Sequence, residues 1–132
     1  MDDRNQDLQI SVDIGEQSVP RLSFAVAGHT TNVALGAEGA GRLAGSLLTA
    51  SFLSSLGQDI PEGTPVPQGQ IAVTEFFCET DPATGLPVLG LTLMGGAKLA
   101  FVFTSDLAVA CATALASEGV KADPTKKAVR PS

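Results

Sequence analysis

Histidine, cysteine and tyrosine, which often perform acid–base or nucleophilic chemistry, are rare or absent in this sequence of 132 residues. His29 is the only histidine, Cys78 and Cys111 are the only cysteines, and Trp and Tyr are absent. A catalytic base needs a nucleophile and an orienting group within hydrogen-bonding reach. His29 is expected at a hairpin tip without such partners, and a pair with Cys78 would require distant hairpin ends to meet. We therefore expect a turn residue at His29 and no catalytic residue in the chain.

The cysteines and the acidic residues do not have the spacing of a metal site. The two cysteines match neither a CxxC motif nor a zinc site, and Cys111 falls on the apolar stripe of an expected helix, typical of a buried thiol. Glu75, Glu79 and Asp81 form the only local acidic cluster, and they do not match an EF-hand. Because charges on an edge strand discourage unwanted strand pairing, we expect a solvated acidic edge there. The sequence predicts no metal site.

Residues 36–43, GAEGAGRL, resemble half of the phosphate-binding loop GxxxxGK followed by Ser or Thr. The match fails at the positions that bind the nucleotide, because Arg42 replaces the lysine and Leu43 replaces the hydroxyl that would hold Mg²⁺. Glu38 would also repel a phosphate. We expect a glycine-rich helix start that allows close packing, and the sequence predicts neither a cofactor nor an enzyme.

The apolar residues follow the period of two that is typical of strands and then the helical period. The strand pattern covers residues 8–14, 22–26, 31–35, 70–79, 89–93 and 99–103, and the helical pattern covers residues 36–57 and 105–119. The phase of the strand at residues 70–79 is ambiguous. Short Gly-containing connections between consecutive strands indicate antiparallel hairpins. The order of elements is therefore three strands and a helix, occurring twice.

The two halves also have similar sequence patterns: residues 22–28 resemble residues 89–95, and residues 31–35 resemble residues 99–103. We predict an α+β fold of two pseudo-repeated βββα modules, with antiparallel sheet or sheets packed on one face by the two helices. Whether the sheets join stays open. The predicted parts are a disordered N-terminus, a first module, a Pro-rich linker, a second module and a disordered basic tail, at residues 1–7, 8–57, 58–69, 70–119 and 120–132.

The second module is expected to carry a largely apolar face on the side away from its helix. Such a face usually marks a covered surface, by a second copy, another protein, the linker or the tail. We predict a protein interface there, and the strand alternation assigns six residues to it: Val88, Thr92, Met94, Lys98, Ala100 and Val102.

Charge and composition limit the partners. Residues 120–132 contain four cations and one carboxylate and so have a net charge of +3. Since the whole chain has a net charge of −6, the remaining residues have a net charge of −9. This acidic body disfavours nucleic acid. No apolar run approaches the ~20 residues that span a bilayer, and no secretory signal begins the sequence. We expect a cytoplasmic protein, and the Ala- and Gly-rich, Lys-poor composition suggests a bacterial or phage source.

These observations favour a small, acidic, non-enzymatic protein-interaction or regulatory protein. Its partner would be another protein or a second copy in a homodimer, since two-fold dimers are the commonest assemblies. A small inhibitor carried by a mobile element fits the acidic surface. The alternative from a different class is a small-ligand binding protein or enzyme with a pocket between the two modules, a usual place for a ligand.

Overall fold

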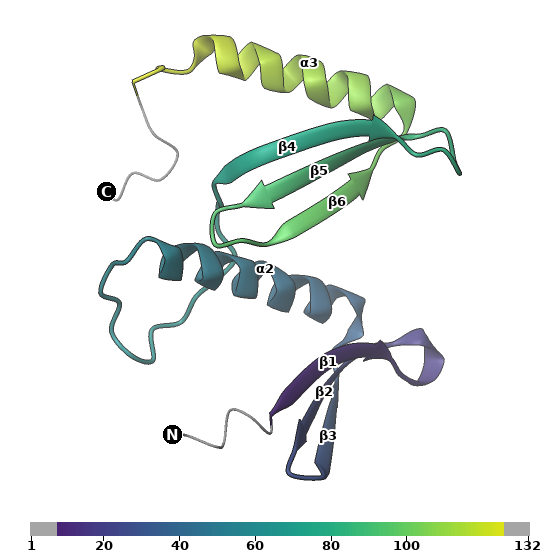
Figure 1. Ribbon diagram of the computed structural model, residues 1–132, viewed down its shortest axis with the longest axis vertical. Coiled ribbons are helices and arrows are strands. Elements are labelled where there is room, and N and C mark those ends of the chain that lie inside the picture. The colour runs from purple at the N-terminus through teal and green to yellow at the C-terminus, as the bar shows by residue number, and fades with distance from the viewer. Residues whose placement is uncertain (1–7, 126–132) are drawn as a thin grey trace. The chain divides into compact units, whose positions relative to one another are not determined.

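The computed structural model describes residues 8–125, which form two three-stranded antiparallel sheets and two α-helices (Figure 1). The predicted α+β class and the twofold βββα order are confirmed, and the two sheets are separate. The elements are β1 (Gln9–Ile14), a short 3-10 turn η1 (Glu16–Ser18), β2 (Pro20–Val26), β3 (His29–Ala34), α2 (Gly36–Ser55), β4 (Val73–Thr80), β5 (Pro87–Leu93), β6 (Lys98–Val102) and α3 (Ser105–Lys121).

The chain divides into two compact units inside α2, between Leu47 and Leu48. The first unit contains β1 to β3, and the second contains β4 to β6 and α3. Residues 58–69, the predicted linker, contain neither helix nor strand. Residues 1–7 and 126–132 of the predicted disordered ends lie outside the described residues, whereas Val120 and Lys121 complete α3.

The first sheet has one apolar and one polar face, as its period of two requires. The β1–β2 register places Ile10 opposite Phe24 and Val12 opposite Leu22. Residues that lie opposite each other point to the same side of a sheet, so these four form the apolar face. The side chains on β1 are exposed, with Val12 at 70%. This apolar face is therefore largely uncovered.

The second sheet is ordered β4-β5-β6 and has a tight contact at its centre. Phe77 on β4 lies opposite Gly90 on β5, and a Cβ atom at Gly90 would overlap the ring of Phe77. The glycine therefore lets the aromatic ring lie across the neighbouring strand, which is a known device for covering a glycine in a sheet.

Apart from Gly90 beneath Phe77, the buried residues described between positions 8 and 125 gather where the end of α2 meets the second sheet. Phe52 of α2, Leu93 of β5 and Ala72 are the buried apolar residues, at 8%, 7% and 9% exposure. Thr49 is also buried, and its Oγ1 accepts a hydrogen bond of 3.1 Å from the backbone N–H of Gly69. This small cluster ties the chain before β4 to the helix.

Helix α3 is well capped but covers little. The Oγ1 of Thr104 accepts a hydrogen bond of 3.3 Å from the backbone N–H of Leu107, and Asp106 lies in the positively polarised first turn. No residue of α3 is buried, and Leu115 is 70% exposed. The predicted burial of Cys111 is wrong, because the helix side chains do not pack closely on the sheet and the thiol is exposed. None of the helices in residues 8–125 is both long and apolar enough to cross a bilayer.

Candidate protein-binding surface

The strand register places most of the predicted interface residues on one face of the second sheet. In the β5–β6 pair, Val88 lies opposite Val102 and Thr92 lies opposite Lys98, with Ala100 between them on β6 opposite Gly90. Directly opposed residues project from the same side, so these five predicted residues share a face.

Met94, the sixth predicted residue, lies one position beyond β5 and is half-buried. Its backbone N–H donates a hydrogen bond of 2.8 Å to the carbonyl oxygen of Ala72. Met94 is therefore held at the end of the sheet near the buried cluster, not within the strand pairing.

Strand β4 completes this face with residues that strand alternation alone does not place there. Glu79 lies opposite Val88, Phe77 opposite Gly90 and Glu75 opposite Thr92. The strand pattern of residues 70–79 was ambiguous in phase, so only the register reveals these neighbours. We call this surface the Phe77 face, and it consists of Glu75, Phe77, Glu79, Val88, Gly90, Thr92, Lys98, Ala100 and Val102.

The Phe77 face combines apolar side chains with charges at its two edges. Val102 is 60% exposed and Phe77 is 51% exposed, whereas Val88 and Thr92 are half-buried. The carboxylates lie on one edge strand and Lys98 lies on the other. Such a surface can form an apolar contact in which the charged rim selects the partner.

The opposite side of the second sheet carries no charge in its paired positions. It combines Phe76, Cys78, Leu89, Leu91, Leu99 and Phe101. Phe76 is 70% exposed. We expected this side to lie beneath the helices, but α3 buries no residue, so much of its apolar surface stays open.

The remaining candidate residues belong to different elements of the chain. His29 begins β3 and is exposed, as are the free cysteines Cys78 and Cys111. Asp81 is engaged in the β4–β5 turn, where its Oδ1 accepts a hydrogen bond of 3.0 Å from the N–H of Ala83. No group of three or more His, Cys, Asp or Glu within residues 8–125 is arranged to hold a metal ion.

The glycine-rich segment at residues 36–43 forms the first turns of α2. Arg42, which stands at the lysine position of the phosphate-loop pattern, donates a hydrogen bond of 3.0 Å to Oε1 of Glu38 one turn earlier. This exposed pair contributes little stability, but it gives the guanidinium a partner within its own helix.

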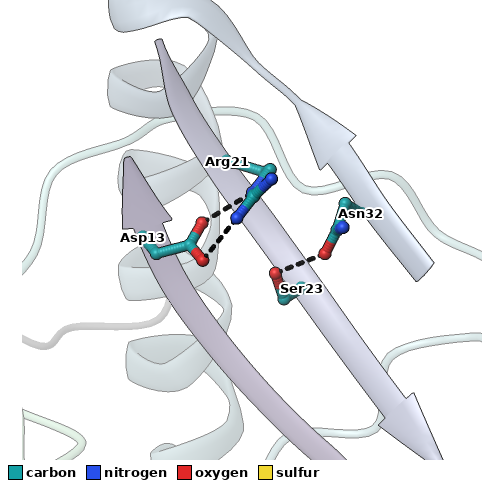
Figure 2. A network of polar contacts seen from close by, with 4 residues as sticks. All are labelled: Asp13, Arg21, Ser23 and Asn32. Atoms are coloured by element: carbon teal, nitrogen blue, oxygen red, sulfur yellow. Dashed lines mark hydrogen bonds and ion pairs between the residues drawn. The ribbon is translucent and has the colours of Figure 1, made fainter. Parts of the chain in front are cut away.

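The polar face of the first sheet holds a small network that Figure 2 shows. Asp13 accepts two hydrogen bonds of 2.8 Å from Arg21 on the neighbouring strand. Ser23 and Asn32 form a second cross-strand bond of 2.7 Å. The two-pronged guanidinium pair fixes the β1–β2 register on this side.

The hydrogen bonds from Arg21, and then its charge, lower the pKa of Asp13 below its ordinary value. Since the folded pKa is depressed, this pair stabilises the fold above the ordinary carboxyl pKa, and its contribution disappears as pH falls through the folded pKa. We expect the pKa of Asp13 to rise toward its ordinary value in Arg21→Gln, measured from carboxyl carbon shifts in an NMR titration. An Asp13 pKa that is equal in both proteins would contradict the pairing.

No protein family, curated protein or solved structure matches this chain.

Proposed function

We propose that this chain is a non-enzymatic protein-interaction protein and that it binds its partner through the Phe77 face of the second sheet. The observation that carries the proposal is the exposure of apolar residues on this face, where Val102 and Phe77 remain more than half exposed. Contiguous apolar surface of this kind on a folded protein is typical of binding sites. Burial of it would contribute about 25 cal/mol for each Å² removed from water.

The two edges of the Phe77 face carry charges of opposite sign. Glu75 and Glu79 lie on β4, and Lys98 lies on β6. Opposite signs on opposite edges suit a partner with complementary edges, and a second copy related by a two-fold axis is one such partner. Rim charges of this kind set partner choice and association rate more than affinity.

The test replaces Val102 of the Phe77 face and Met94, which lies just beyond β5, in the full chain, as Val102→Glu together with Met94→Glu. If the native chain forms an oligomer, we expect light scattering to give a lower mass for the variant. If the native chain retains a protein from a bacterial lysate, we expect the variant not to retain it. The reason is that a buried, unpaired carboxylate costs several kcal/mol at an interface.

A matched control carries the same charge change on α3, as Val109→Glu with Leu115→Glu. Both positions are exposed apolar residues outside the Phe77 face. The proposal fails if the two double variants behave alike, or if the variant on the Phe77 face assembles and retains partners as the native chain does. Circular dichroism of both variants shows whether they are folded.

A further inference from the structure

We propose that the partner adds an extended segment to the outer edge of β4, and that this segment carries two cationic side chains four residues apart. This inference rests on the proposed protein-binding function and identifies the chemistry of the partner. It assigns to Glu75 and Glu79 a role in recognition.

The outer edge of β4 is an open strand. Val73–Thr80 is the longest strand described, it lies at the edge of its sheet, and all eight of its residues are exposed. Within residues 8–125 no strand pairs with this side of β4. In an antiparallel sheet, the N–H and C=O groups of alternate residues on an edge strand point outward, so they can bind an added strand.

The side chains on this edge provide charge complementarity. Glu75 and Glu79 project to the same side as Phe77, because their partners on β5 are Thr92, Val88 and Gly90. Four residues of strand separate the carboxylates by about 13 Å. None of the ion pairs formed in the described part of the chain involves either carboxylate. By contrast, Asp13 on the edge strand β1 is already paired with Arg21.

The same charges oppose pairing of β4 with β4 of a second copy around the exposed aromatic residue. If Phe77 of two copies lay opposite each other, antiparallel pairing would place each Glu75 opposite a Glu79. Like charges directly opposite each other destabilise a strand pair. The edge is therefore better suited to a cationic segment than to itself.

The sequence of this chain itself contains two cations four residues apart, and a peptide with this segment can serve as a probe. Lys126 and Arg130 are four residues apart, with the small residue Ala128 between them. On an added strand of either direction, two cations with this spacing can face both carboxylates while the middle residue faces Phe77. A synthetic peptide of residues 124–132, PTKKAVRPS, therefore carries the charges that β4 should recognise.

The experiment measures binding of this labelled peptide by fluorescence anisotropy. The receptor is the full-length chain with Lys126→Gln and Arg130→Gln, which removes competition from the chain's own cations without adding carboxylates. We expect saturable binding, with the affinity about tenfold weaker once Glu75→Lys and Glu79→Lys are added, since attraction becomes repulsion. Peptide binding should also slow hydrogen exchange of the β4 backbone amides, because an added strand bonds to them.

Two controls separate strand addition from general charge attraction. Asp59→Lys with Glu62→Lys changes the net charge equally at exposed positions outside both sheets, and should leave the affinity unchanged. The peptide PTKKRAVPS has the same composition but places the arginine two residues after the first lysine, and should bind several-fold more weakly.

Absence of saturable binding up to about 1 mM would overturn the inference, as would equal weakening by both charge variants. Binding without protection of the β4 amides would also overturn strand addition. Failure of the proposed function is a separate result, because it would appear as unchanged assembly and partner retention in Val102→Glu with Met94→Glu.

Discussion

Replacing Gly95 with alanine is expected to destabilise the second unit by about 3 kcal/mol. Gly95 has a φ of +108° in the β5–β6 turn, a conformation that costs an L-residue about 1–2 kcal/mol. A Cβ atom there would also lie 3.0 Å from the backbone carbonyl carbon and oxygen of Ser51 in α2. Because backbone cannot move aside as a flexible side chain does, overpacking adds about 1–3 kcal/mol.

Urea denaturation followed by circular dichroism measures this loss as a lower transition midpoint. Gly96→Ala is the matched control, since Gly96 has a similar φ of +104° but no atom within 4 Å of the position of an added Cβ. We expect it to lose only the conformational part, about 1–2 kcal/mol. Equal losses in the two variants would contradict the close approach of the turn to α2.

Replacing Phe52 with alanine is expected to cost about 3–4 kcal/mol, because truncation of a buried aromatic residue loses its burial and leaves a cavity. Phe52 is 8% exposed and is the largest side chain in the small buried cluster. The cluster has few other apolar members, so little else can compensate for the loss of the ring.

The same denaturation experiment tests this prediction. Leu47→Ala is the control on the same helix, because Leu47 is 60% exposed, and we expect it to cost less than about 1 kcal/mol. A small effect of Phe52→Ala, similar to that of Leu47→Ala, would show that the cluster does not support the fold. Neither Gly95 nor Phe52 belongs to the Phe77 face, so these variants also calibrate stability effects against binding effects.

Much of the candidate surface could be predicted because strand alternation is local. Knowing that Val88 and Thr92 alternate with leucines on β5 is enough to place them together, and the Gly95–Gly96 turn pairs them with β6. The contribution of β4 could not be predicted in this way. A shift in the β4–β5 register between Val73 and Glu75 changes which β4 residues share a face with β5. The ring of Phe77 can lie over the neighbouring strand only because that position is Gly90.

The sequence by itself determined the order of strands and helices and the antiparallel hairpins. These features depend on interactions over a few residues, such as side-chain alternation and turn glycines. Only the tertiary structure decided which apolar residues are covered. The apolar periodicity of a helix or strand is the same whether its apolar side chains are buried within the chain or remain exposed. For this reason the predicted burial of Cys111 was wrong, and the exposure of the sheet face that contains Phe76 was not predicted.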